Sequence, residues 1–221
     1  MFPLRDSSTS RTGFAFFTYL LIITTVAVFF MQPTSEVELF AFLQQWAVVP
    51  RLIDWTRPDT LLPLITSVFL HANLFHLFSN VWFLHIYGDN VEHDLGPVAY
   101  LLFYLAGGIA AAVAQLAFTS ATSEIPLLGA SGAIAAVMGY YIARFPRNRI
   151  TSLVLSFGYV STVQLPATFV LLMWIGLQIL NGFGSLGMEG GGVAWWAHIG
   201  GFVFGLGIGI LRNAFGAHTL R

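Results

Sequence analysis

The chain has 221 residues, of which 57% are apolar and only 9% are charged, and its formal net charge is −1. Soluble domains carry about 25% charged residues on average, so this composition indicates an integral membrane protein. The nearly neutral charge argues against nucleic acid as a partner. Because the chain has no cysteine, disulfides, thiolate nucleophiles and cysteine-ligated metals are all excluded.

Six apolar runs predict six membrane-spanning helices. They cover residues 14–31, 64–87, 97–118, 130–144, 164–181 and 194–211. We therefore expect an all-α integral membrane domain over residues 14–212, with short tails at 1–13 and 213–221. An even number of spans puts both termini on one side, and placing that side in the cytoplasm gives it seven of the nine arginines. Since arginines gather in cytoplasmic loops, the sequence favours an N-in, C-in orientation.

Two reactive residues lie inside these apolar runs, Ser131 in Gly-Ala-Ser-Gly and His198 in Trp-Trp-Ala-His-Ile-Gly-Gly. Polar side chains at bilayer depth are costly, so their presence suggests chemistry. Small residues repeat at i, i+3 and i+7 in both runs: Gly132, Ala135 and Gly139 in one, and Gly201 and Gly205 after His198 in the other. Such faces let helices approach closely, which would bring the imidazole to the hydroxyl. The alternative is ordinary small-residue packing, in which Ser131 only hydrogen-bonds between helices.

The run that begins at Ser131 is short. From Ser131 to Arg144 is 14 residues, about 21 Å of helix against a hydrocarbon core of about 30 Å. If Arg144 marks the cytoplasmic interface, Ser131 lies below the outer surface and is preceded by non-helical chain. Such chain is tolerated at that depth only beside protein or water, so we expect a polar cavity open to the outside.

The second run contains the histidines His71 and His76 and the asparagine Asn80. His76 and Asn80 are four residues apart, so their N–H groups could point at one shared oxygen. His71 lies about 140° away around the helix, and this spacing does not fit helical metal ligands. We therefore expect no metal.

These motifs together resemble those of the rhomboid family of intramembrane serine proteases. The residues that carry the resemblance are His71-x4-His76-x3-Asn80, Gly129-Ala-Ser131-Gly132 and Ala197-His198-x2-Gly201-x3-Gly205, in the family's order. The resemblance implies a six-helix bundle in which Ser131 is the nucleophile and His198 the general base. It further implies that His76, Asn80 and the backbone N–H of Ser131 stabilise the oxyanion, with His71, Gly129, Gly132, Gly201 and Gly205 in supporting roles.

The resemblance also suggests that the glycine-rich stretch 182–192 is a mobile cap over the site, although such a stretch equally fits a flexible connector. In some bacterial members a tyrosine four residues after the serine stacks on the histidine, but here that position is Ala135. A serine–histidine pair requires no cofactor.

Three functions are compatible with the sequence. The first is an endopeptidase that cuts transmembrane segments of other proteins within the lipid bilayer. The second is a catalytically silent, rhomboid-like protein that binds membrane helices, and the third is a small-solute transporter. The intact serine, histidine and Asn80 favour the first, and the lack of an internal repeat disfavours the third. We expect a multi-pass protein of a plasma membrane, and the compact form suggests a prokaryote.

Overall fold

The computed structural model describes residues 2–7, 13–156, 159–186 and 192–216. Each of the six predicted runs overlaps one helix: α1 (Phe16–Met31), α4 (Leu74–Leu95), α5 (Pro97–Ala117), α6 (Ser131–Arg144), α7 (Ala167–Gly184) and α8 (Trp195–Gly216). Shorter helices occupy the connection between α1 and α4: α2 (Glu36–Trp46), η1 (Pro50–Leu52), η2 (Pro58–Thr60), α3 (Pro63–Thr66) and η3 (Ser67–Phe69). Three strands complete the described chain: β1 (Phe2–Asp6), β2 (Arg149–Ser156) and β3 (Tyr159–Pro166).

Apolar helices of membrane-spanning length identify a membrane protein. Among the described residues, α5, α7 and the Trp195–Phe215 part of α8 are long and apolar enough to cross a bilayer. A fourth candidate is the pair Pro58–Phe69 and Leu74–Leu95, which is bent by 82°. The second predicted run is thus broken, and its long helix starts only at Leu74. Helix α1 is apolar but has 16 residues, and α6 has 14, so the six-span arrangement stays a prediction.

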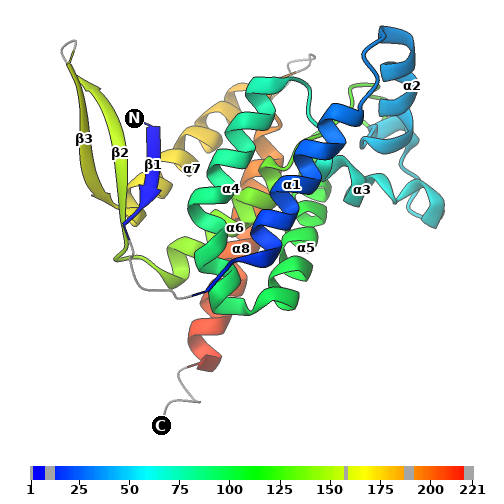
Figure 1. The fold of residues 1–221 in the computed structure, drawn as a ribbon. Coiled ribbons are helices and arrows are strands. Elements are labelled where there is room, and N and C mark those ends of the chain that lie inside the picture. The colour runs from blue at the N-terminus through cyan, green and yellow to red at the C-terminus, as the bar shows by residue number, and fades with distance from the viewer. Residues whose placement is uncertain (1, 8–12, 157–158, 187–191, 217–221) are drawn as a thin grey trace.

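Helix α6 is the central helix of the bundle. Every residue from Gly132 to Ile142 is buried, as expected for a helix whose whole circumference is apolar. Helices α4, α5 and α8 all pack against it, and Figure 1 shows it in the middle of the bundle. Ser131, its first residue, is therefore carried by the most enclosed element of the fold.

The prediction of a purely helical chain is wrong in one respect, because the structure contains a three-stranded antiparallel sheet in the order β1-β2-β3. The sheet lies to one side of the bundle, against α4 and α7 (Figure 1). Strand β1 comes from the tail predicted at 1–13, and β3 includes residues 164–166, which were predicted to begin the fifth span. Hydropathy windows do not detect this sheet because β1 pairs with residues about 150 positions away.

A buried carboxylate joins the start of α1 to α4. Glu92 of α4 accepts hydrogen bonds from the backbone N–H of Phe17 and of Thr18, at 2.9 and 2.7 Å. Helix α1 has no side-chain cap of its own, so Glu92 satisfies N–H groups that the first turn of a helix leaves unpaired. The negative charge also lies at the positive end of the helix dipole.

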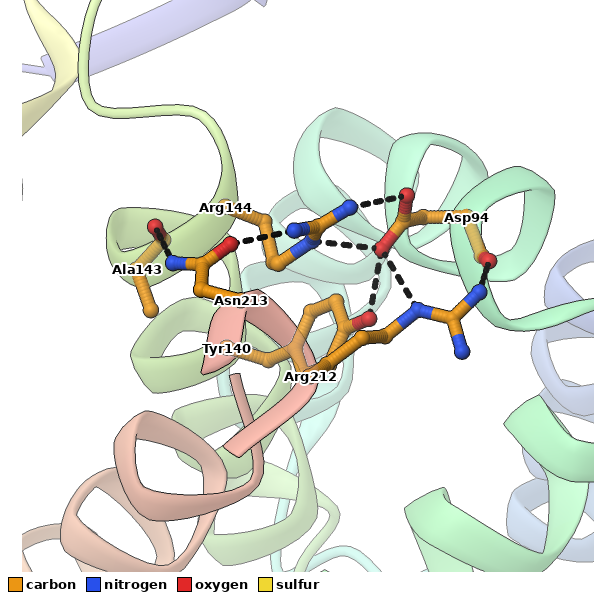
Figure 2. A network of polar contacts seen from close by, with 6 residues as sticks. All are labelled: Asp94, Tyr140, Ala143, Arg144, Arg212 and Asn213. Atoms are coloured by element: carbon orange, nitrogen blue, oxygen red, sulfur yellow. Dashed lines mark hydrogen bonds and ion pairs between the residues drawn. The ribbon is translucent and has the colours of Figure 1, made fainter. Parts of the chain in front are cut away.

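A polar cluster at the far end of α6 ties α4, α6 and α8 together (Figure 2). Asp94 of α4 accepts hydrogen bonds from Tyr140 at 2.5 Å and from Arg144 Nε at 2.9 Å, both on α6. Arg212 of α8 adds a contact from its Nε to the same carboxylate oxygen at 3.3 Å, and Asn213 accepts from Arg144. Because Arg144 ends α6 and Ser131 begins it, this cluster fixes the end of the bundle opposite the serine.

Candidate active site

Ser131 begins α6 directly after a segment of non-helical chain. Gly129 has a φ of 120°, a conformation that side chains rarely tolerate, and its N–H donates to the carbonyl of Ser67 at 2.9 Å. Just before it, Leu127 exchanges two backbone hydrogen bonds with Val48, at 2.8 and 3.1 Å. The irregular chain that leads to the serine thus has protein partners for its backbone, as non-helical chain at bilayer depth would require.

The hydroxyl of Ser131 meets the imidazole of His198. His198 lies in the first turn of α8, its side chain is buried, and its Nε2 is 2.8 Å from the Oγ of Ser131. This distance is that of a hydrogen bond. Two residues that are 67 positions apart in the chain are therefore in direct contact inside the bundle.

Glycines make this contact possible because α6 and α8 touch backbone to backbone. A Cβ built on Gly201 of α8 would collide with the carbonyl of Gly132, and one built on Gly205 would collide with the carbonyl of Ala136. Gly139 of α6 faces the carbonyl of Phe202 in the same way. The small-residue stripes predicted from the sequence do face each other.

The structure places His71, His76 and Asn80 in one group beside this pair. His71 precedes α4 and is fully buried, and its Nε2 is 3.0 Å from the Nδ2 of Asn80. The same Nδ2 donates to the carbonyl of His76 at 3.0 Å, and the rings of His71 and His76 meet edge to face at 4.9 Å. A Cβ on Gly129 would lie 2.7 Å from the His76 ring, so His76 abuts the loop that delivers Ser131.

The position of His71 differs from the one expected for a single helix that carries His71, His76 and Asn80. His71 is not on the helix that carries Asn80, because α4 starts at Leu74 with Asn73 as its cap. The turn before the helix folds His71 back onto Asn80, whose amide already donates to His71 and His76. An oxyanion bound by Asn80 would therefore have to take over one of these hydrogen bonds.

Two residues that the sequence analysis did not select also contact His198, both from α7. The Oε1 of Gln178 lies 2.7 Å from the Nδ1 of His198, and the ring of Trp174 lies 5.6 Å from the imidazole. A buried glutamine within an apolar run, four residues after a tryptophan, is the signal that could have identified them.

A small cavity of about 20 Å³ adjoins Ser131. Small residues form much of its wall, among them Gly108, Ala111, Gly132 and Ala197. A larger hollow of about 800 Å³ lies between the end of α5 and the facing ends of α7 and α8, and Leu127 and Ala194 line both. The two spaces therefore share part of their walls.

Two further expectations can be compared with the described residues. Of the stretch 182–192 that was predicted as a cap, residues 182–184 belong to α7, and 187–191 lie outside the described residues. In the described part of the chain, no group of three or more histidine or carboxylate side chains is arranged to hold a metal ion.

The described chain is thus a helical membrane protein with a serine and a histidine in contact at its centre. A family model for the rhomboid domain matches residues 58–215, and the chain belongs to the rhomboid family. The family resemblance carried by the sequence motifs is confirmed.

Named relatives agree with this assignment. The chain is 32% identical to RHOMBOID-like protein 12, mitochondrial, of Arabidopsis thaliana, over 66% of this chain and 49% of the relative. It is also 32% identical to Rhomboid protease GluP of Bacillus subtilis (strain 168), over 61% of this chain and 25% of the relative. The human presenilin-associated rhomboid-like protein, mitochondrial, is 30% identical over 40% of this chain and 24% of its own length. The chain thus spans half or less of these relatives.

Proposed function

We propose that the protein is an intramembrane serine endopeptidase in which Ser131 is the nucleophile and His198 the general base. The observation that carries the proposal is the 2.8 Å contact between His198 Nε2 and Ser131 Oγ, made by side chains of two helices that share a glycine seam. A weak nucleophile needs an adjacent base, and this contact is within the reach required for proton transfer.

The reaction follows from this geometry in two halves. As Ser131 Oγ attacks the carbonyl carbon of the substrate, its proton passes to His198 Nε2, and the carbonyl oxygen becomes an oxyanion. The imidazolium then donates the proton to the leaving amine, and the peptide bond breaks to leave an acyl ester on Ser131. A water molecule, deprotonated by the same imidazole, attacks the ester. The imidazolium then returns the proton to Ser131 Oγ as the ester bond breaks, and the second product leaves with the new carboxyl group.

The start of α6 supplies stabilisation for the oxyanion. The N–H groups of a first helical turn have no partner within the helix, and the helix dipole makes this end positive. Ser131 is the first residue of α6, so its own N–H belongs to this set. We assign His76 and Asn80 as further donors, because their group borders the Gly129 loop that leads to Ser131.

We propose transmembrane segments of other membrane proteins as the substrates. Amides within a helix are hydrogen-bonded and shielded, so a segment must unwind locally before its carbonyl can reach Ser131. Residues that weaken a helix favour unwinding. The cavity beside Ser131 holds about 20 Å³, roughly the space of one water molecule, which suits a small side chain next to the cleaved bond.

Six spans with both termini in the cytoplasm complete the proposal. The arginine distribution supports it, and Arg144 and Arg212 lie together at the end of the bundle opposite Ser131. We place the domain at residues 14–212 of a multi-pass protein, in a prokaryotic plasma membrane.

Labelling with a fluorophosphonate tests the proposal. This reagent forms a covalent bond with an activated serine, so the purified protein should gain one adduct on Ser131. We expect no adduct in Ser131→Ala and a much slower one in His198→Ala. A wild-type protein that does not react would contradict the proposal and favour a silent binding protein or a transporter, and an adduct that persists in Ser131→Ala would exclude this nucleophile.

A further inference from the structure

Gln178 is a buried amide on an apolar transmembrane helix. It lies in the second half of α7, and its side chain is only 7% exposed. A polar side chain at this depth destabilises the fold unless its hydrogen-bonding groups find partners. Both ends of the Gln178 amide have partners, and one of them is the proposed general base.

The two contacts of Gln178 define which way its amide points. Its Nε2 donates to the backbone carbonyl of Trp174, one turn earlier in α7, at 3.2 Å. Its Oε1 faces the Nδ1 of His198 at 2.7 Å. With the amide reversed, its oxygen would face the carbonyl oxygen of Trp174, and two acceptors would oppose each other. The Trp174 carbonyl therefore keeps the amide oxygen directed at His198.

An oxygen that faces Nδ1 fixes the position of the imidazole proton. Amide oxygen only accepts hydrogen bonds, so Nδ1 must carry the proton, and the lone pair of the neutral ring is then on Nε2. That is the nitrogen 2.8 Å from Ser131 Oγ. In the other tautomer, Nε2 would carry a hydrogen and could not accept the serine proton.

We propose that Gln178 is a positioning residue that holds His198 in its reactive tautomer and ring orientation. This inference rests on the proposed function, because it gives His198 the role of base. The contacts among Gln178, His198 and Ser131 form one line of hydrogen bonds from α7 through α8 to α6. A histidine in such a line has its second nitrogen oriented by its neighbour.

Aromatic rings hold the plane of the same imidazole. Trp174 of α7 is tilted by 39° against the ring at 5.6 Å, and Trp195 of α8 meets it edge-on at 6.3 Å. Trp174 and Gln178 are four residues apart and so lie on one face of α7. Helix α7 thus supplies both the hydrogen bond and an aromatic contact that orient the base, whereas position 135 on α6 is only an alanine.

A glutamine orients a histidine without a charge. The described parts of α6, α7 and α8 contain no aspartate or glutamate, so no carboxylate of these helices faces the imidazolium that forms during reaction. Loss of the Gln178 contact would cost one neutral hydrogen bond and the bias toward one tautomer. We expect a loss of about 10- to 100-fold in rate.

The tautomer can be measured directly in the wild-type protein. Histidine is labelled with ¹⁵N, and the two ring nitrogens of His198 are assigned in detergent micelles at pH 8.5 by comparison with His198→Ala. We expect Nδ1 to show the shift of a protonated nitrogen and Nε2 that of a bare one. A ring protonated at Nε2, or an even mixture of the two tautomers, would overturn the inference without any change to Gln178.

Kinetics of fluorophosphonate inactivation give the second test. Gln178→Met keeps the length of the side chain but removes the acceptor, so the limiting inactivation rate should fall about 10- to 100-fold, while the concentration for half-maximal rate stays constant. Gln178→Glu keeps an oxygen at the same reach and should recover most of the rate. The control is Gln164→Met, the same exchange on the exposed strand β3, which should react like wild type.

The outcomes distinguish failure of the proposed function from failure of the role proposed for Gln178. If the wild-type protein does not react, the proposed function fails and this inference fails with it. If wild type reacts and Gln178→Met reacts equally fast with its tautomer unchanged, only the role of Gln178 is refuted. If Gln178→Met does not fold, the wild-type spectrum and the inactivation rate of Gln178→Glu still test the role of Gln178. A Gln178→Glu variant that reacts as slowly as His198→Ala would contradict the inference.

Discussion

Exchange of Gly205 for alanine adds one methyl group to the seam between α6 and α8. Gly205 lies seven residues after His198, about two helical turns, so it faces the same partner helix. Its backbone packs directly on that of Ala136, and no flexible side chain lies between them. The added carbon can be accommodated only if the two helices move apart.

The size of the displacement follows from the distances at this site. The new Cβ would lie 2.6 Å from the carbonyl carbon of Ala136 and 2.8 Å from its Cα. Carbon atoms in contact are about 3.5–4.0 Å apart, and the carbonyl oxygen of Ala136 would lie closer still to the new Cβ, so α8 must shift by at least about 1 Å. Such a shift would stretch the 2.8 Å contact between His198 and Ser131 beyond hydrogen-bonding range. We expect about a hundredfold loss in rate, together with about 1–3 kcal/mol of lost stability from overpacking.

The assay is the rate of fluorophosphonate inactivation in detergent micelles, combined with the thermal unfolding midpoint. Gly207→Ala is the matched control, because a Cβ at Gly207 on the same helix meets nothing within 4 Å. We expect this control to react like wild type and to be slightly more stable, since alanine favours a helix over glycine by about 1 kcal/mol. Wild-type reactivity in Gly205→Ala would refute the view that the glycine seam sets the distance between base and nucleophile.

Three further predictions concern other parts of the molecule. Asn80→Ala should lower the rate of peptide cleavage about a hundredfold if Asn80 binds the oxyanion, and an unchanged rate would remove it from that site. An imidazole acts as a base only when neutral, so the inactivation rate should fall when the protein is acidified; a rate that rises toward pH 4 would contradict the role of His198. Asp94→Asn should lower the free energy of unfolding by about 1–3 kcal/mol, because Arg144 and Arg212 lose their shared carboxylate. The inactivation rate of the folded Asp94 variant should stay within about threefold of wild type, and a larger loss would show that this distant cluster shapes the active site.

Features that depend on residues close together in the sequence, such as helices and short motifs, could be predicted. Apolar runs located the helices because hydropathy is a property of neighbouring residues. Glycine spacing predicted that the helices carrying Ser131 and His198 could approach closely, and the family resemblance paired the two side chains, whereas ordinary small-residue packing was the alternative. The family assignment rested on these same short motifs.

Features that depend on distant partners were not predictable. The sheet requires β1 to meet β2, and no local pattern in residues 2–6 encodes that partner. The sequence around Gln178 does not indicate which residue it contacts. Its contact with His198 arises only when α7 packs against α8. The pairing of His71 with Asn80 depends on the turn before α4, which the uninterrupted apolar run concealed.

The most direct test of the central claim is the appearance of new peptide termini within membrane segments. Purified protein is reconstituted in vesicles with a membrane-protein extract, and new N-termini are identified by mass spectrometry for wild type and for Ser131→Ala. We expect termini inside or next to transmembrane segments, with small residues beside the cut, and none of them with Ser131→Ala. The same termini with the alanine variant, or none with a wild-type protein that is folded, would contradict hydrolysis by the pair Ser131 and His198.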